Sequence, residues 1–171
     1  RLDRSAAPCT VQSFLFLTRQ RYFDHTVCHR PTPYPRLSVL QCGDPLGTGE
    51  GDPGYSFKDE LPTDLAPAPD DPSGLRKIYP RGTLAMANAG PATNGSQFFL
   101  VYKDSTLRPN YTVFGRVSDR GIRVLDPIAA GGVAPGSDQQ TAGAPALRAA
   151  LKRATVVAQD LARRAQGVSG A

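Results

Sequence analysis

The segment GTLAMANAGPATNGSQFF, residues 82–99, decides the fold of this chain. The residues from Thr83 to Met86 predict a short buried strand, and the apolar and aromatic run 97–102 predicts a second strand. The Gly-Pro and Asn-Gly dipeptides between them predict turns. Because the intervening residues are small, they leave backbone N–H and C=O groups uncovered, and an extended peptide could lie against these groups. A tight loop between two core strands is the alternative that composition alone leaves open.

Three ordered segments resemble the cyclophilin peptidyl-prolyl isomerases, in their bacterial form. Residues 83–99 resemble the signature segment of that family, and Tyr22–Arg30 (YFDHTVCHR) resembles the strand that carries its catalytic His-Arg pair. Gln41–Glu60 resembles the strand and loop that follow, and weaker matches extend the resemblance over most of residues 7–157. The resemblance implies a mainly β fold, in which two helices cap a closed antiparallel barrel of eight strands.

The composition is that of one globular domain. The chain has 171 residues, of which 40% are hydrophobic and 20% charged, enough for a single core. No apolar run approaches the ~18 residues that cross a bilayer. Although the formal net charge is +5, Lys and Arg are scattered, with some density at residues 148–164. We therefore expect no nucleic-acid partner, and an anion-binding role of the 148–164 segment is a minor alternative.

Domain organisation follows from the extent of the resemblance. We predict a cyclophilin-like domain over residues 1–158 and a basic tail over residues 159–171. Members of the family begin with a strand hairpin that would lie mostly upstream of Arg1, so we expect the N-terminal strand or strands to be missing here. The chain should be monomeric unless the missing strand leaves an exposed edge. We favour the cytoplasm as its location and leave an upstream membrane anchor open.

Local spacing predicts the remaining elements. Pro8 is a favourable first residue for a helix, and an interior Pro127 should kink or shorten a second one. Composition at the C-terminus fits either a helix or the closing strand that the family needs, and we favour the strand, centred on residues 154–157. The predicted elements are a helix at 8–20, a strand at 22–30, a long Pro-rich surface loop at 61–82, a strand at 111–117, a helix at 119–130 and a strand at 148–157.

Cysteine and histidine usage predicts neither a metal site nor a disulfide framework. Cys9, Cys28 and Cys42 cannot all pair, and none has CxxC spacing, so reduced thiols are expected. The family fold would place Cys28 and Cys42 on neighbouring strands, which leaves open an incidental disulfide under oxidation. His25 and His29 have no carboxylate or thiol at ligand spacing.

The resemblance implies that Arg30 is the catalytic residue. Rotation about an X-Pro bond faces a barrier of ~20 kcal/mol because amide resonance must be broken. A guanidinium donor directed at the prolyl nitrogen favours its pyramidal, non-resonant form, and Arg is always charged and offers several fixed donors. Stabilising the twisted amide more than either planar isomer is sufficient, so no cofactor is needed. Proline-containing proteins are the implied substrates, and the activity would assist their folding.

The resemblance also implies a set of peptide-binding residues. In that set Gln41, Asn88 and Gln97 would bind the peptide backbone, while Phe99 and Leu107 would hold the proline ring. The apolar pocket suits a ring that offers nothing to hydrogen-bond. The full set is His29, Val39, Gln41, Gly47, Ala87, Asn88, Ala89, Gln97, Phe99, Leu107 and Tyr111.

The chain departs from the family pattern in two places. Residues 31–36 (PTPYPR) lengthen the segment before Gln41, where the family has a Phe-Met pair in its proline pocket. Counting back from Gln41 gives Ser38 and Val39 for this pair, and Leu37 or Tyr34 are alternatives that stay open. Thr106 stands where many members have a Trp, so we expect weak cyclosporin binding with isomerase activity kept.

The sequence has two other functional interpretations. The departures at the pocket leave open a proline-peptide binding module whose catalysis is weak or lost. Residues 43–54 (GDPLGTGEGDPG) superficially resemble a phosphate-binding loop, but the Lys-Ser/Thr ending is missing and no helix is predicted to follow. We therefore interpret this segment as a Gly-rich turn beside the peptide groove.

Overall fold

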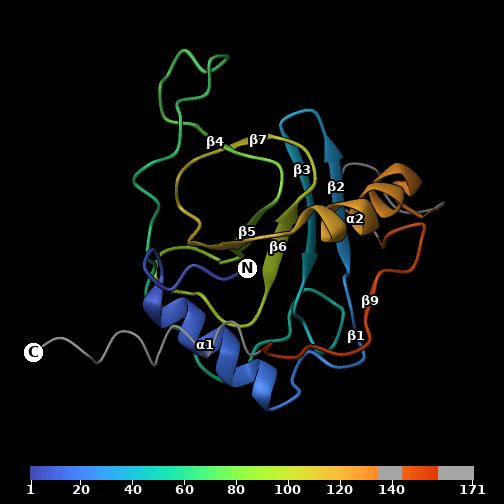
Figure 1. Cartoon of the computed structure of the whole chain (residues 1–171). Coiled ribbons are helices and arrows are strands. Elements are labelled where there is room, and N and C mark those ends of the chain that lie inside the picture. Colours follow the sequence, from blue (N-terminus) through green and yellow to red (C-terminus); the bar gives the residue numbers. More distant parts are fainter. Residues whose placement is uncertain (135–143, 158–171) are drawn as a thin grey trace, which may run out of the picture.

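The structure is a computed structural model that describes residues 1–134 and 144–157, and it is mainly β with two helices (Figure 1). The helices are α1 (Pro8–Arg19) and α2 (Asp119–Gly131). The strands are β1 (Thr26–Val27), β2 (Arg30–Tyr34), β3 (Leu37–Cys42), β4 (Lys77–Tyr79), β5 (Thr83–Met86), β6 (Phe98–Val101), β7 (Ser105–Leu107), β8 (Val113–Arg116) and β9 (Ala150–Leu151).

Five strands form one antiparallel sheet in the order β2-β3-β6-β5-β8. The two strands predicted from residues 82–99 are its β5 and β6, and they pair with each other near the middle of the sheet, as Figure 1 shows. The prolines of β2 are compatible with its place at the edge, because an edge strand tolerates residues that lack an N–H donor. The prediction of a strand at 111–117 is confirmed by β8.

A closed barrel of eight strands is not confirmed. The described residues form the five-stranded sheet and two separate ribbons, β1-β9 and β4-β7. At the outer edge of β8, Leu2 bridges Gly115 and the N–H of Asp3 donates to the carbonyl of Phe114 at 2.8 Å. That edge is thus covered by the first residues of the chain, as expected for the end of an edge strand.

The expected strand at residues 22–30 is wrong over most of its length. The chain turns at this point, with positive φ angles at Arg21 (59°) and His25 (63°), and β1 contains only Thr26 and Val27. Phe23 is 1% exposed although it lies in a turn. An aromatic residue favours a strand locally, but the side chain of Phe23 is buried in the core from a turn. Its burial therefore overrides its strand propensity.

Two other elements differ from the sequence predictions. The Pro-rich segment 61–82 contains β4, which pairs with β7 and thereby joins this supposed surface loop to the sheet structure. The closing strand is β9 at Ala150–Leu151, and it has only the two-residue β1 as its partner, so residues 154–157 form no strand. The predicted basic tail, residues 159–171, lies outside the described residues.

Both predicted helices are present. In α1 the buried Val11 and Leu15 face the sheet, and Phe14 packs against Phe23, Phe98 and Phe114 with ring centroids 5.0 to 5.3 Å apart. Helix α2 begins after Ser118, whose Oγ accepts a hydrogen bond from the N–H of Gly121 at 3.2 Å. It continues through Pro127 to Gly131, so it is not shortened there. No helix in the described part of the chain has the length and apolarity of a membrane span.

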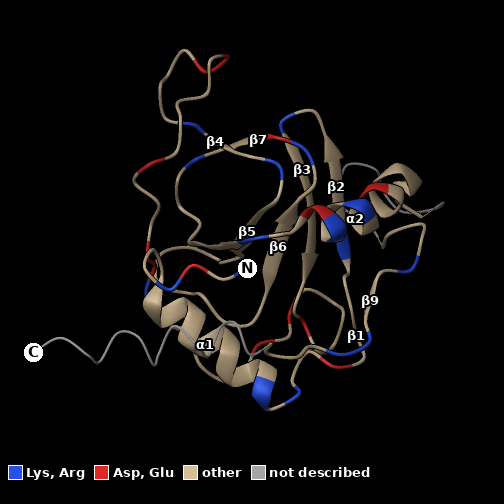
Figure 2. Cartoon of the chain, viewed as in Figure 1, with Lys and Arg blue, Asp and Glu red and all other residues tan. Residues whose placement is uncertain are grey.

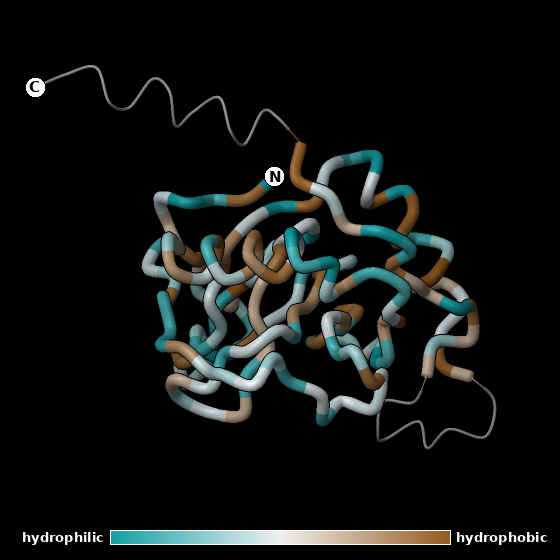
Figure 3. Tube along the Cα trace, turned by 90° about the horizontal axis from the view of Figure 1, so that it is seen from below, coloured by the Kyte–Doolittle hydropathy of each residue, from teal (hydrophilic) through white to brown (hydrophobic). Residues whose placement is uncertain are grey.

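The sheet separates two apolar clusters, because successive side chains of a strand point to opposite faces. The larger cluster contains α1 residues together with Leu40, Leu84 and Phe98. The smaller cluster lies on the other face and contains Val39, Tyr79, Ala85, Phe99 and Val101. Figure 3 shows hydrophobic and hydrophilic residues interspersed along the trace. The larger cluster is the core, which leaves the opposite face available for a site.

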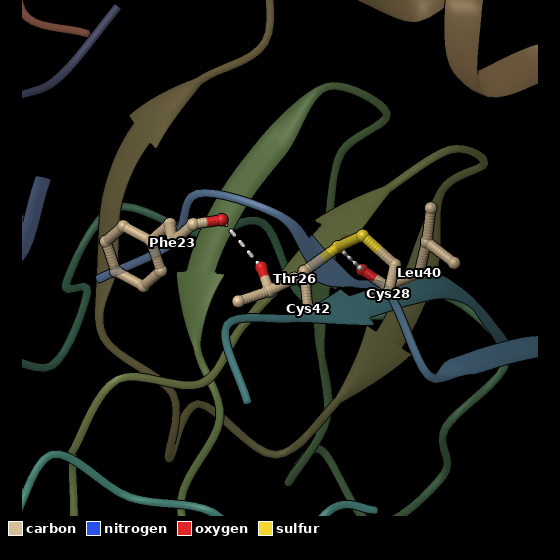
Figure 4. The surroundings of a disulfide bond; sticks show 5 residues. All are labelled: Phe23, Thr26, Cys28, Leu40 and Cys42. Carbon is tan, nitrogen blue, oxygen red and sulfur yellow. Dashed lines mark hydrogen bonds between the residues drawn. A yellow bond between two sulfur atoms is a disulfide. The ribbon is translucent and has the colours of Figure 1, made fainter. Parts of the chain in front are cut away.

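The expectation of reduced thiols at Cys28 and Cys42 is wrong, because these two residues form a disulfide (Figure 4). Both are buried, at 4% and 0% exposure, and they are 14 residues apart in sequence. Cys9 is the exposed free thiol. The family fold predicted that the two cysteines would lie on neighbouring strands. That their side chains face each other depends on the turn that replaces the expected strand at 22–30.

Candidate functional site

The candidate site begins with a row of residues that crosses the sheet. Arg30 of β2 is paired with Gln41 of β3, Gln41 with Phe99 of β6, and Phe99 with Ala85 of β5. Residues directly opposite each other in adjacent strands point to the same face. The sheet register therefore places Arg30 and Gln41 on the face that carries the smaller apolar cluster.

A relay of side-chain amides positions the guanidinium of Arg30. Its Nη1 donates to Oε1 of Gln41 at 3.3 Å, and Nε2 of Gln41 donates to Oε1 of Gln97 at 2.7 Å. Nε2 of Gln97 in turn donates to the carbonyls of Gly49 (2.8 Å) and Gly51 (3.0 Å). A guanidinium has five N–H donors, so the bond to Gln41 orients exposed Arg30 while other donors face solvent.

The smaller apolar cluster supplies an apolar surface on the same face. Leu107 and Tyr111 pack against Val39 and Phe99, and the rings of Phe99 and Tyr111 meet edge to face with centroids 5.5 Å apart. Of the residues left open by the sequence, Leu37 joins this cluster with Val39. Ser38 points away from both, and its hydroxyl donates to the carbonyl of Tyr34. The cluster is the part of the site that suits a proline ring.

Tyr79 of β4 supports this cluster, and sequence reasoning missed it. The side chain is fully buried, and its hydroxyl donates to the carbonyl of Tyr111 at 3.2 Å. Burial raises the pKa of Tyr79 to about 12, so the hydroxyl stays a neutral donor at physiological pH. No sequence signal could have singled it out, because it lies in a Pro-rich segment whose pairing with β7 is a tertiary contact.

The signature loop after β5 has fewer free backbone N–H groups than its composition suggested. The N–H of Ala87 donates to the carbonyl of Gln97 at 3.0 Å, and the N–H of Ala89 donates to Oγ1 of Thr93 at 2.8 Å. Nδ2 of Asn88 donates to the carbonyl of Asn110 at 2.8 Å. These donors are engaged within the chain, so a peptide would meet mainly carbonyl groups and small side chains here.

Five of the sequence-predicted residues line one groove. The groove has a volume of about 600 Å³ and lies between the signature loop and the Gly-rich loop 49–56. The predicted residues that line it are Gln41, Ala87, Asn88, Ala89 and Gln97. Gln41 lines the groove and also bonds Arg30, which lies on the same face of the sheet as the apolar cluster. The amide relay therefore connects the groove to that face.

His29 and Gly47 take no part in lining this groove. The ring nitrogens of His29 are buried and have no hydrogen-bond partner among the described residues. Burial lowers the pKa of His29, so the ring is neutral at physiological pH. Gly47 has a φ of 69°, and a Cβ there would lie 2.8 Å from a methyl group of Val27. Gly47 itself belongs to the Gly-rich segment 43–54, and a Cβ on Gly49 of that segment would lie 3.7 Å from Nε2 of His29.

Asp44 holds the Gly-rich loop in place, and sequence reasoning also missed this residue. It is fully buried, and its carboxylate accepts the backbone N–H groups of Leu46 (2.7 Å) and Thr48 (2.8 Å). Gly51 passes so close that a Cβ there would lie 1.9 Å from Oδ1 of Asp44. Burial by itself would raise the pKa of Asp44, but the backbone N–H donors outweigh it and the pKa is lowered.

Replacing Asp44 with asparagine should lower the unfolding free energy by about 2 kcal/mol at pH 7, because an amide group would face N–H donors that then lack an acceptor. A lowered folded-state pKa means that the ionised carboxylate stabilises the protein above its unfolded pKa and ceases to do so as pH falls through the folded pKa. Urea denaturation from pH 7 to pH 3 should therefore show the difference between wild type and Asp44→Asn shrinking below about pH 4. A difference that stays constant would contradict this account.

Among residues 1–134 and 144–157, no group of three or more His, Cys, Asp or Glu side chains is placed to hold a metal ion. A larger hollow of about 690 Å³ lies between the N-terminal segment, residues 60–65 and β8. None of the sequence-predicted site residues lines it. The chemistry available at the site is thus that of a guanidinium, amides and an apolar surface.

Known isomerases are similar to most of this chain. A probable peptidyl-prolyl cis-trans isomerase B of Mycobacterium leprae (strain TN) is 54% identical over 152 residues, which cover 88% of this chain and 50% of that protein. A probable isomerase B of Mycobacterium tuberculosis (strain ATCC 25618 / H37Rv) is 56% identical over 137 residues, covering 80% of this chain and 44% of that protein. The chain thus spans about half the length of these relatives.

Matches to a shorter relative and to a solved structure cover most of both chains. The peptidyl-prolyl cis-trans isomerase B of Streptomyces anulatus is 39% identical, with 81% of each chain covered. A Cryptosporidium parvum cyclophilin-type isomerase, crystallised in the presence of the dipeptide Ala-Pro, is 28% identical with a TM-score of 0.68, covering 90% of this chain and 87% of that one. The family model described as "Cyclophilin type peptidyl-prolyl cis-trans isomerase/CLD" matches residues 1–152. The chain therefore belongs to the cyclophilin-type peptidyl-prolyl cis-trans isomerase family.

Proposed function

We propose that this chain accelerates cis-trans rotation about X-Pro bonds in proteins and so assists their folding. The observation that carries the proposal is the cross-sheet row Arg30, Gln41 and Phe99, which places an oriented, exposed guanidinium on the same face as an apolar cluster. A proline ring on Phe99, Val39 and Leu107 would bring its amide nitrogen toward the sheet edge that carries Arg30.

The proposed catalysis is electrostatic. Amide resonance makes the planar isomers stable, with a barrier of ~20 kcal/mol between them. In the twisted amide the prolyl nitrogen becomes pyramidal and gains a lone pair that can accept a hydrogen bond. A guanidinium N–H held in place by Gln41 would bind this form more strongly than either planar isomer, which lowers the barrier without a covalent intermediate or cofactor.

The proposed partners are proline-containing peptides and proteins. The Ala-Pro dipeptide named for the Cryptosporidium relative supports this class of ligand. Lys and Arg residues are dispersed over the elements in Figure 2, which favours neither a nucleic-acid surface nor a basic groove. We also propose that cyclosporin binds weakly, because Thr106 of β7 replaces a larger aromatic surface beside Leu107.

A binding module whose catalysis is weak or lost is the second candidate. It is favoured by Thr106, a half-buried residue whose hydroxyl is buried without a hydrogen-bond partner among the described residues. A threonine gives this rim of the pocket a smaller apolar surface than an aromatic side chain would. Such a module would bind proline peptides through the apolar cluster. It would leave the rate of isomerisation unchanged or raise it only slightly.

We further propose that the sheet is part of a closed eight-stranded antiparallel barrel and that the chain is monomeric. Support comes from contacts that already join the ribbon β4-β7 to the sheet. The N–H of Ser38 donates to Oγ of Ser105 at 2.9 Å, and the N–H of Thr106 donates to the carbonyl of Arg36 at 2.9 Å. An open, unpaired edge would instead promote association.

The experiment that tests the function is the cis-to-trans relaxation of an Ala-Pro peptide, measured with and without this chain at 10 °C, where the uncatalysed reaction takes minutes. We expect the relaxation rate to rise in proportion to enzyme concentration. A folded sample that binds the peptide but leaves the rate unchanged would instead establish the binding module.

A further inference from the structure

We propose that Asp44 is a positioning residue for the isomerisation, which acts on the guanidinium of Arg30 through the Gly-rich segment 43–54 and the amide relay. Asp44 is fully buried, and it belongs neither to the lining of the groove nor to the smaller apolar cluster, so it would not touch the peptide. The inference rests on the proposed function, and it adds a buried residue on which the rate depends.

The Gly-rich segment is attached to two adjacent residues just before β6. Oγ of Ser96 donates to the carbonyl of Gly43 at 2.7 Å, and a Cβ on Gly43 would lie only 2.3 Å from the carbonyl oxygen of Ser96. Nε2 of the next residue, Gln97, donates to the carbonyls of Gly49 and Gly51. The path of the chain between these two attachments therefore decides where the carbonyls that hold Gln97 are placed.

Asp44 sets that path. Its carboxylate accepts the backbone N–H groups of Leu46 at 2.7 Å, Thr48 at 2.8 Å and Gly49 at 2.5 Å, and all three lie between the two attachments. Hydrogen bonds to an ionised acceptor are about twice as strong as neutral ones. On the far side of the carboxylate, Gly51 approaches so closely that it has no room for a Cβ. One buried carboxylate thus determines the shape of the segment.

The two segment carbonyls fix the direction of both glutamine amides. A carbonyl oxygen only accepts hydrogen bonds, so the NH2 group of Gln97 must face Gly49 and Gly51, and its Oε1 must face away from them. That oxygen accepts Nε2 of Gln41, which turns Oε1 of Gln41 toward Nη1 of Arg30. A flipped Gln41 would instead present a donor group to a guanidinium, which has only donors. The placement of the carbonyls is therefore needed for an oriented arginine.

Loss of the anchor should lower the rate more than the affinity. Asp44→Asn replaces one acceptor oxygen with an NH2 group that faces N–H donors of the segment. We expect kcat to fall about tenfold, because a misplacement of about 1 Å can cost about 10²-fold in rate. KM should change by about threefold at most, because no residue of the smaller apolar cluster belongs to the Gly-rich segment.

Gly51→Ala disturbs the same anchor while the carboxylate is kept. The added methyl group would lie 1.9 Å from Oδ1 of Asp44, so the carboxylate or the segment must move. Gly51 has no positive φ, so the close contact is the source of the effect rather than a backbone conformation that only glycine adopts. This variant should show the same pattern as Asp44→Asn, a lowered kcat with little change in KM.

Asp3→Asn is the matched control. Asp3 is also a carboxylate that accepts backbone N–H groups of its own turn, those of Ser5 and Ala6 at 3.1 Å. It lines the other hollow and has no link to the amide relay. The same chemical change at this position should leave both kcat and KM unaltered.

A double-mutant cycle with Arg30→Ala separates positioning from a general loss of structure. If Asp44 acts only through Arg30, adding Asp44→Asn to Arg30→Ala should lower the residual kcat/KM by less than about twofold. A substitution that only lowers the folded fraction would instead reduce the activity by the same factor in both backgrounds. The cycle therefore gives an answer even if Asp44→Asn is partly unfolded.

All variants are compared in the relaxation of the Ala-Pro peptide at 10 °C. A lowered kcat in Asp44→Asn and Gly51→Ala that is absent from the Arg30→Ala background would support the proposal. Full kcat in Asp44→Asn, or an equal loss in both backgrounds, would overturn it and leave the proposed function standing, because wild type and Asp3→Asn would still isomerise the peptide. A wild type that leaves the relaxation unchanged would refute the proposed function and this inference with it.

Discussion

Replacing Arg30 with alanine should lower kcat/KM for an Ala-Pro peptide by 10²–10³-fold, comparable to the loss of one oriented donor from an electrostatic catalytic site. The substitution removes the guanidinium from an exposed edge position, so the fold should be kept. The apolar cluster around Phe99 remains, so peptide affinity should fall far less than the rate. Isomerisation kinetics and peptide titration on the same sample would separate the two effects.

Two further variants sharpen this prediction. Arg30→Lys keeps the charge but loses the planar fork of donors, and it should recover only part of the activity. Arg19→Ala removes an exposed arginine at the end of α1 and serves as the control for net charge, with activity unchanged. If Arg30→Ala retained full activity, the guanidinium would have no catalytic role. A parallel loss of affinity and rate would instead show that Arg30 only binds the ground state.

Removing the disulfide through the double substitution Cys28→Ser and Cys42→Ser should lower the unfolding free energy by about 3 kcal/mol, the value expected for a loop of this length. The cysteines are 14 residues apart, and the closed loop contains the hairpin of β2 and β3 with Arg30, Val39 and Gln41. The bond therefore joins the two ends of the segment that carries the proposed catalytic arginine and its amide partner.

Denaturation with and without a dithiol reductant would measure this contribution. Reductant should destabilise the wild type by a similar amount and leave the double variant unaffected, whereas Cys9→Ser should retain the response of the wild type because Cys9 is the free thiol. Because both cysteines are buried, reduction under native conditions should be slow and should require opening of the hairpin. A wild type with equal stability in both conditions would show that the disulfide makes no contribution to folding.

Much of the architecture could be predicted from local sequence. The strands β5 and β6 followed from apolar runs separated by turn dipeptides, and α1 followed from Pro8 and the spacing of Val11 and Leu15. The expected proline-ring residues Val39, Phe99 and Leu107 do lie in one cluster. The strands and the helix depend on side-chain periodicity and on short motifs, which the sequence displays directly, whereas the proline-ring residues were implied by the resemblance to the family.

Other features of the site arise from contacts between distant segments. The amide relay joins Arg30, Gln41, Gln97 and the Gly-rich loop, and no local pattern indicates which side-chain nitrogen meets which oxygen. Asp44 looked like an ordinary loop carboxylate, yet the loop folds around it and buries it completely. The partners in the relay lie 11, 56 and 48 residues apart in the sequence, whereas Asp44 is bonded by the next few residues of its own loop, whose closure around it no sequence pattern indicates.

The sequence by itself determined the mainly β class, both helices, the central pair of strands and the identity of the candidate arginine. The tertiary structure alone decided the turn in place of a strand at residues 22–24, the Cys28–Cys42 disulfide, the support of the pocket by Tyr79 and the burial of Asp44. The physical reason is that periodicity encodes which face of an element is buried. Which partners meet there depends on sheet register and loop closure, and these emerge only when the whole chain packs.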